Sequence, residues 1–208
     1  MIRSFVLACA KPIHRRLRER KLDVFFQLAG TPQLSERLLD VGGGSGIDGE
    51  FLRLYSRFSE TFIVNLQRSR LDAPKDILVR TIIADGRSLP FASGSVDWVF
   101  SNAVIEHVGG WQDQLRFAAE IRRAARRGYF VATPNKYFPI EPHTMFPFYQ
   151  FLPEHLQRKV IRWWPGYMRE YEEVHLLSSA QLQELFPEAR VQRVPIPGNT
   201  LIAYYAKA

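Results

Sequence analysis

A glycine-rich stretch is the first place where residue types and spacing point to chemistry. Residues 37–51 read RLLDVGGGSGIDGEF. Asp40 starts the spacing D-x-G-x-G-x-G, whose glycines are Gly42, Gly44 and Gly46. The first spacing suits a pocket for S-adenosylmethionine (SAM), whereas G-x-G-x-x-G, which starts at Gly44, suits a dinucleotide pocket. In both cases a glycine turn after a strand lets the backbone approach a ligand closely.

Two details of this turn favour SAM over a dinucleotide. A dinucleotide turn should begin where the strand ends, but Gly44 comes two residues after Gly42. The SAM interpretation also gives Asp40 a task, because an acid at the end of the first strand can face the cationic end of the ligand. The turn alone does not decide between the two cofactors, and a tight turn without a ligand would also use glycines.

Acid–base side chains follow two later apolar segments. Glu106 and His107 stand in IEHV, and Glu141 and His143 stand in PIEPHT. Loops that leave the carboxyl ends of adjacent parallel strands meet at one edge of the sheet, so these side chains could converge. A single histidine more often has a structural role, but histidine also suits a general base near neutrality. We expect His143 to act as the base or to orient an acceptor, with Glu141 holding it and His107 as the next candidate.

The same four side chains are also of the types that bind metal ions. They lack the helical H-x-x-x-H type of spacing that would support a metal centre. We therefore expect no metal.

Apolar segments and helical patterns alternate along the chain, which predicts a parallel α/β sheet with helices on both faces. The expected strands are residues 37–41, 61–66, 77–84, 95–101, 128–133, 189–194 and 200–206. The expected helices are residues 47–57, 111–126, 154–164 and 178–186. The order of these elements predicts that the glycine turn and both acid–base loops follow strands.

Two segments flank this pattern within what we expect to be a single domain over residues 1–208. Residues 1–30 contain a basic amphipathic helix, expected from about residue 11. Residues 134–176 are rich in proline and aromatic residues. This second segment is too apolar for a disordered linker and too rich in proline for a regular element. We expect it to form an ordered insertion over the active site.

The charge pattern narrows the class of partner. The formal net charge is +7, and basic residues cluster at 11–21 and 122–127. Such clusters can meet phosphate groups, but a solvated helix face is the simpler explanation. SNAV stands where base-methylating enzymes carry an N/D-P-P-Y/F motif, and we recognise no nucleic-acid-binding module. We expect no specific nucleic-acid binding, and possible contact of the basic N-terminal helix with a membrane surface.

Cysteine content and hydropathy bear on the compartment. Cys9 is the only cysteine, which excludes an internal disulfide and a cysteine-based zinc cluster. The apolar run at residues 5–10 is shorter than the apolar region of a signal peptide. No apolar stretch approaches the roughly 18 residues of a membrane span. We expect a cytoplasmic, soluble protein.

Three motifs in order carry a resemblance to a known family. They are LLDVGGGSG (38–46), ADGRSLPFASGSVDWVFSNAVIEHV (84–108) and GYFVATPN (128–135). With them the chain resembles the class I SAM-dependent methyltransferases over nearly its whole length. The pair SNAVIEHV and TPNKYFPIEPH is similar to a bacterial, type-11-like branch. The resemblance implies a Rossmann-like, seven-stranded sheet that is mostly parallel, with one antiparallel strand near the C-terminus.

The resemblance also implies which residues surround SAM. These are Asp40, Gly42, Gly44, Gly46, Asn65, Leu66, Asp85, Gly86, Asn102 and Ala103. The glycine turn would line the methionine half, Asp85 and Gly86 the adenine edge, and Asn102 and Ala103 the methionine end. Asn65 departs from the acid that usually binds the ribose hydroxyls. A neutral hydrogen bond in place of a charged one costs about 1 kcal/mol, or roughly tenfold in affinity at most.

The expected activity is transfer of a methyl group from SAM to an oxygen or nitrogen atom, less often carbon. The acceptor would be a small molecule, lipid-like or sugar-like, and the cofactor product is S-adenosylhomocysteine. Two alternatives stay open. A non-catalytic SAM-binding module for interaction or regulation draws its support from Asn65, and an NAD-dependent oxidoreductase rests on GSGIDG alone.

Overall fold

A computed structural model gives the structure of the chain. It describes residues 16, 19–30, 32–43, 51–67, 74–164, 168, 170–194 and 199–207. Two predicted cofactor residues, Gly44 and Gly46, lie outside these ranges, as do residues 1–15 and 17–18 of the basic N-terminal segment. In the described part of the chain, no helix combines the length and the apolar character that crossing a bilayer requires.

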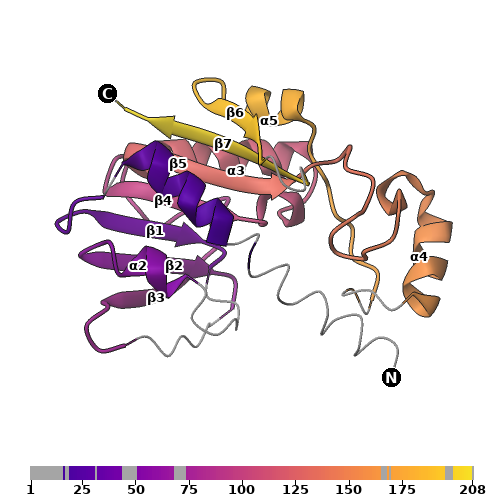
Figure 1. Ribbon diagram of the computed structural model, residues 1–208, viewed down its shortest axis with the longest axis horizontal. Helices are drawn as coiled ribbons and strands as arrows, with labels where there is room; N and C mark the ends of the chain where they lie inside the picture. Colours follow the sequence, from indigo (N-terminus) through magenta and orange to yellow (C-terminus); the bar gives the residue numbers. More distant parts are fainter. Residues whose placement is uncertain are drawn as a thin grey trace.

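A seven-stranded sheet with the order β3-β2-β1-β4-β5-β7-β6 forms the centre of the fold (Figure 1). The strands are β1 (Arg37–Val41), β2 (Glu60–Asn65), β3 (Val79–Ile83), β4 (Val96–Asn102), β5 (Ala125–Pro134), β6 (Arg190–Arg193) and β7 (Thr200–Ala206). All neighbours pair in parallel except β7, which runs antiparallel to both β5 and β6. The predicted mostly parallel sheet with one antiparallel strand is therefore confirmed.

The central strands are apolar because helices cover both faces of the sheet. Every residue of β4 from Val96 to Ser101 is buried, as is β5 from Gly128 to Pro134. The strand order reverses between β1 and β4, since β2 and β3 extend the sheet on one side of β1 and β4 begins the other side. A ligand of an open α/β sheet binds at such a reversal, beyond the carboxyl ends of the strands.

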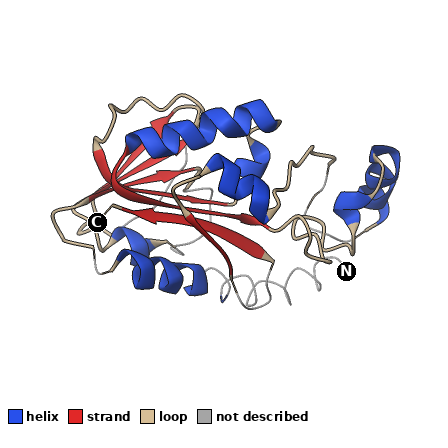
Figure 2. Cartoon of the chain, turned by 90° about the horizontal axis from the view of Figure 1, so that it is seen from above, coloured by secondary structure: helices blue, strands red, loops and turns tan. Residues whose placement is uncertain are grey.

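Helices lie on both faces of the sheet in the view from above (Figure 2). The named helical elements are α2 (Leu52–Tyr55), η1 (Ile105–His107), α3 (Trp111–Ala124), η2 (Tyr149–Phe151), α4 (Glu154–Trp163) and α5 (Ser179–Leu185). One core lies between the sheet and α3 and α5, where Phe117, Ile121 and Leu182 are fully buried. The predicted helix 111–126 is confirmed except at its end, because α3 stops at Ala124 and β5 begins at Ala125.

The second core lies under the N-terminal helix, which is helical over residues 19–29. Figure 1 shows it in indigo, crossing β4 and β5. Phe25 has no exposed surface, and its ring meets Trp98, Phe100 and Phe130 edge-on at centroid distances of 5.8, 5.8 and 5.5 Å. The apolar side of this helix at Phe25 therefore faces the protein's own core and not a lipid surface.

The segment between β5 and α5 lies beyond the carboxyl ends of the parallel strands, with α4 at its far side (Figure 1). Its two ends are paired, because Asn135 and Leu177 form a β-bridge and Lys136 N donates to Leu177 O at 3.0 Å. A second bridge, Ile140 to Pro147, folds the segment back on itself. The segment that was predicted to cover the active site therefore begins at the carboxyl ends of the parallel strands, where a ligand is expected.

Candidate functional site

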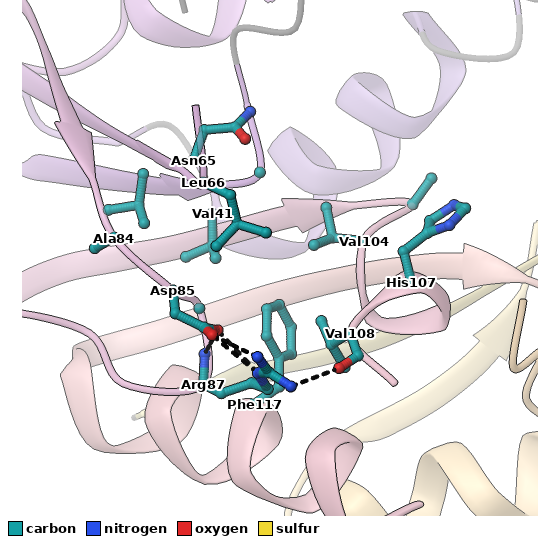
Figure 3. Close-up of a pocket in the computed structure, with 14 residues that line it drawn as sticks. Val41, Asn65, Leu66, Ala84, Asp85, Arg87, Val104, His107, Val108 and Phe117 are labelled. Carbon is teal, nitrogen blue, oxygen red and sulfur yellow. Dashed lines mark hydrogen bonds and ion pairs between the residues drawn. The ribbon is translucent and has the colours of Figure 1, made fainter. Parts of the chain in front are cut away.

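A cavity of about 300 Å³ opens at the carboxyl ends of β1, β2 and β4, where the strand order reverses (Figure 3). Its volume is at the lower end of the range for small-molecule sites. The residues that line it are Val41, Gly42, Val64, Asn65, Leu66, Ala84, Asp85, Gly86, Arg87, Ala103, Val104, His107, Val108 and Phe117.

Six of the predicted cofactor residues line this cavity, and they follow four different strands. They are Gly42, Asn65, Leu66, Asp85, Gly86 and Ala103. Two others do not line it. Asp40 is buried within β1, and Asn102 turns its carbonyl Oδ1 to the N-terminal helix, where it accepts from Lys21 Nζ at 2.9 Å. The sheet therefore gathers most of the predicted set, although the residues lie far apart in the sequence.

Asp40 lies beneath the glycine turn. Its carboxyl group accepts a hydrogen bond of 2.5 Å from Tyr55 Oη, and the residue is 2% exposed. A Cβ atom at Gly43 would lie 2.1 Å from Asp40 Oδ2, so the turn can cover the carboxyl group only with glycine at that position. Burial raises the pKa of Asp40 to about 7, against the opposing effect of the Tyr55 hydrogen bond. A cation bound above the turn would favour the ionised form.

Asn65, at the end of β2, supports the same turn from the other side. Its Nδ2 donates to the carbonyl oxygen of Gly43 at 3.2 Å. A carboxylate at this position could not donate that bond. The departure from the usual acid therefore has a structural reason, and the side-chain carbonyl of Asn65 is the atom suited to accept from a ribose hydroxyl.

Asp85 is held by an arginine that sequence reasoning missed. Arg87 Nη2 lies 2.7 Å from Asp85 Oδ2, and the Arg87 backbone N–H donates to Oδ1 at 2.8 Å. Hydrogen bonds from Arg87 hold the pKa of Asp85 below its ordinary value. Arg87 also donates to the carbonyl oxygen of Val108 at 3.2 Å, and Figure 3 draws both interactions at the cavity wall. Asp85-Gly86 is thus both a turn and part of the cavity.

Two backbone conformations shape the cavity floor. Gly42 has φ +85° and Ala103 has φ 57°, a left-handed region that a residue with a Cβ atom rarely adopts. Ala103 is held there by its N–H, which donates to Ala132 O at 2.8 Å. A Cβ at Gly42 would lie 2.3 Å from Val104 Cγ2, well inside contact distance. Only glycine lets the turn approach Val104 this closely.

Gly42→Ala is therefore expected to be more damaging than Gly94→Ala. Both glycines have positive φ, but an added Cβ at Gly94 meets nothing within 4 Å. Both variants carry the backbone strain of about 1–2 kcal/mol, and Gly42→Ala adds roughly 1–3 kcal/mol of overpacking. Urea unfolding measures the difference in stability, and calorimetry should show weaker SAM binding for Gly42→Ala alone. Equal losses of stability and unchanged binding in both variants would contradict the close contact with Val104.

The predicted acid–base residues come together at the edge of the cavity. His143 Nδ1 lies 2.5 Å from Glu141 Oε1, and His143 Nε2 lies 3.1 Å from His107 Nε2. His107 Nδ1 in turn lies 2.8 Å from Glu172 Oε1. His107 also lines the cavity. The four side chains thus form a continuous line from the cavity wall into the segment after β5, and Glu172 is the member that the sequence pattern did not reveal.

Glu141 fixes the loop that presents His143. Its Oε2 accepts from Thr144 N at 2.7 Å and from Thr144 Oγ1 at 2.8 Å, and the residue is buried. Although burial opposes ionisation, the bonds from His143 and Thr144 hold the pKa of Glu141 below its ordinary value. Burial likewise opposes the charged form of His143, but the neighbouring Glu141 raises its pKa. The site therefore draws positive charge towards His143.

Glu106 is the fourth predicted residue of this region, and it is fully buried. Its Oε2 accepts from Thr133 Oγ1, near the end of β5, at 2.9 Å. One ligand-type atom from each of Glu106, His107 and His143 lies within 4.8 Å of the others. Strands β4 and β5 therefore deliver the two predicted loops to one place, as the sequence pattern indicated.

Comparison with known families identifies a domain in the middle of the chain. Residues 39–132, a little under half of the chain, match the family model described as a methyltransferase domain. This range contains every residue that was predicted to contact SAM. Glu141 and His143 lie outside it. No curated protein matches the chain significantly.

Solved structures share the fold over most of the chain at low sequence identity. Magnesium protoporphyrin IX methyltransferase from Synechocystis PCC 6803, solved with S-adenosylhomocysteine, has a TM-score of 0.60 at 12% identity, with 94% of this chain and 84% of that chain covered. A putative methyltransferase from Haloferax volcanii, in complex with the activator Trm112, has a TM-score of 0.59 at 18% identity, with coverages of 97% and 95%. At these identities the likeness concerns the fold.

One further match shows that structures similar to this fold are not all described as methyltransferases. A protein from Rhodobacter sphaeroides, described as a putative zinc-dependent alcohol dehydrogenase, has a TM-score of 0.63 at 11% identity, with 91% of this chain and 90% of that chain covered. The match of residues 39–132 to a methyltransferase domain is the observation that favours SAM over NAD. The match of residues 39–132 to a methyltransferase domain, together with the fold shared with SAM-dependent methyltransferases, indicates an enzyme that uses SAM as its cofactor.

Proposed function

We propose that the enzyme transfers the methyl group of SAM to an oxygen or nitrogen atom of a small-molecule acceptor, and that His143, held by Glu141, takes the acceptor's proton or orients the acceptor. The observation that carries this proposal is the position of His107, which lines the cofactor cavity and contacts His143 Nε2 at 3.1 Å. An acceptor at the two imidazoles would lie next to the expected methyl group.

Methyl transfer requires mainly that the acceptor atom and the methyl group of SAM are aligned. The sulfonium methyl group is already electrophilic, and the acceptor atom must approach it in line with the S–CH3 bond at about 3–3.5 Å. The acceptor gains the methyl group and loses a proton, while SAM leaves as S-adenosylhomocysteine. A histidine pair at the cavity wall provides a place for that proton or a hydrogen bond that fixes the acceptor.

The surface of the segment after β5 supports an acceptor with an apolar part. Tyr137, Ile140, Phe148 and Phe151 are exposed on the segment that carries His143. Tyr137 and Phe151 stack at a centroid distance of 6.3 Å. These exposed apolar side chains are near His143 in the sequence. They favour a lipid-like acceptor over a purely sugar-like one.

SAM and S-adenosylhomocysteine are expected to raise the melting temperature of the protein, whereas NAD and NADP are not. A ligand that binds only the folded state stabilises it by about 2.7 kcal/mol at a hundredfold excess over its Kd. Thermal melting with each ligand measures this directly. A shift with NAD and none with SAM would return the chain to the oxidoreductase alternative.

The activity itself is tested with labelled SAM and fractions of a cell extract. Label that moves into a low-molecular-mass product, identified by mass spectrometry, supports the proposed acceptor class. Label in protein or nucleic acid would contradict it. Firm SAM binding with no transfer to any fraction would favour the alternative of a non-catalytic SAM-binding module.

A further inference from the structure

The two imidazoles of His107 and His143 face each other in an arrangement that calls for a cation. Each Nδ1 lies beside a carboxylate oxygen, at 2.8 Å for His107 and 2.5 Å for His143. A carboxylate accepts hydrogen bonds, so each Nδ1 carries a hydrogen and each neutral ring has its lone pair on Nε2. The two Nε2 atoms are 3.1 Å apart. Two lone pairs at this distance repel unless a proton or a metal ion lies between them.

A third donor favours the metal ion. Glu106 has no exposed surface, and among the described residues its Oε1 has no hydrogen-bond partner. A buried carboxylate oxygen without a partner is costly, so it is rare unless an ion or water satisfies it. A carboxylate oxygen of Glu106 belongs to the same group of atoms as the imidazole nitrogens, with one ligand-type atom of each residue within 4.8 Å of the others. One shared proton would leave this carboxylate unsatisfied.

We propose that Glu106, His107 and His143 bind a divalent cation of the zinc type. Two imidazoles and one carboxylate are a donor set that suits Zn²⁺ and related ions, and three protein ligands leave a position open for another group. The ideal separation of two nitrogens on one tetrahedral zinc ion is about 3.3 Å at Zn–N distances of 2.0–2.1 Å. The observed 3.1 Å between the Nε2 atoms needs little adjustment.

Each proposed ligand is already oriented by a second side chain. Glu141 holds the ring of His143, Glu172 holds the ring of His107, and Thr133 Oγ1 donates to Glu106 Oε2 at 2.9 Å. Metal-binding histidines usually donate their other ring N–H to a carboxylate or a carbonyl in this way. The rings of His107 and His143 stand at 89° to each other, so both in-plane lone pairs can point at one ion.

The proposal differs from the expectation that the sequence supports. The usual sign of a histidine metal site is a short repeat on one helix, but these ligands come from η1 and from a loop 36 residues further along the chain. The role of the ion rests on the proposed function, because the open position would face an acceptor. An acceptor hydroxyl bound there would lose its proton more readily. With the ion bound, His143 Nε2 would orient the acceptor through the ion and would not itself take the proton.

Metal binding can be measured without SAM, an acceptor or activity, so its failure and that of the proposed function are distinguishable. The full chain, without a histidine tag and freed of metal by a chelator, is titrated with Co²⁺ and followed by visible absorption, and with Zn²⁺ by calorimetry. We expect one equivalent of each ion to bind and the bound Co²⁺ to show the strong bands of low coordination number. Zn²⁺ should also raise the melting temperature.

Variants locate the ion. His107→Ala and His143→Ala are each expected to lower the Zn²⁺ affinity by more than about 100-fold, and Glu172→Gln by about 10-fold, because loss of an orienting carboxylate costs roughly 10–100-fold. His155→Ala, on the exposed surface of α4, is the matched control and should bind as the wild type does. Absence of stoichiometric binding in the wild type, or equal binding by the double variant His107→Ala/His143→Ala, would overturn the proposal.

Discussion

Replacement of His143 with alanine is expected to lower methyl-transfer turnover by about 10²–10⁴-fold, the usual contribution of a positioned acid–base group. His143 does not line the cofactor cavity, so the affinity for SAM should remain nearly unchanged. The side chain is the link between His107, at the cavity wall, and Glu141, in the loop. Removal of the ring takes away the group that we propose contacts the acceptor, while the residues that line the cavity stay in place.

The variant should keep its fold, because Glu141 retains its bonds to Thr144 N and Oγ1. Turnover with an identified acceptor, SAM calorimetry and thermal melting form the test. His155→Ala controls for the loss of an exposed histidine. Full turnover in His143→Ala would refute the assignment, and a joint collapse of SAM binding and stability would assign His143 a structural role instead.

A second large effect is expected from the buried carboxyl group of Asp40. Between about pH 4 and pH 7 the wild type should lose about 4 kcal/mol of its free energy of unfolding relative to Asp40→Asn. The sign follows from the pKa, which burial raises from 3.8 to about 7 in the folded state. Within this window the unfolded chain has released the proton and the folded chain still holds it. The folded state binds more protons, so stability falls as the pH rises.

Urea unfolding of both proteins at a series of pH values measures this difference, and the Asn variant cancels the titration of all other groups. Parallel curves for the two proteins would contradict the raised pKa. SAM provides an independent check, because its cationic end favours the ionised carboxylate. Near pH 6–7 SAM binding should release protons in the wild type and fewer in Asp40→Asn, which calorimetry in buffers of different ionisation enthalpy detects.

The sequence predicted the sheet well because buried parallel strands are continuous apolar segments, as in β4 and β5. It also placed His107 and His143 together, because loops after neighbouring strands share one edge of the sheet. The contacts that it missed depend on tertiary distance. Nothing near Asp40 in the pattern reveals that Tyr55 reaches it from α2, and Glu172 lies 65 residues from His107.

Asp40 also shows the limit of a motif. Its position near the end of the first strand predicts an acid near the ligand, but not whether the side chain lies in the cavity wall or beneath the turn. The structure places it beneath the turn, so close to Gly43 that no side chain would fit at position 43. The motif is also insufficient at Asn65. A neutral residue in place of an acid suggests weaker ligand binding, and only the structure shows that Asn65 donates a hydrogen bond to Gly43 O.

The paired ends of the segment after β5 have a consequence for how the protein could change. The chain leaves the sheet at Asn135 and returns at Leu177, and these two residues are bridged. Such a segment is an insertion whose two ends lie side by side, so that it leaves and rejoins the fold at a single point. Its length and sequence can vary without moving a strand, at a closure cost that grows slowly with length. Exchange of this segment would alter the proposed acceptor side of the enzyme and leave the strand ends around the cavity intact.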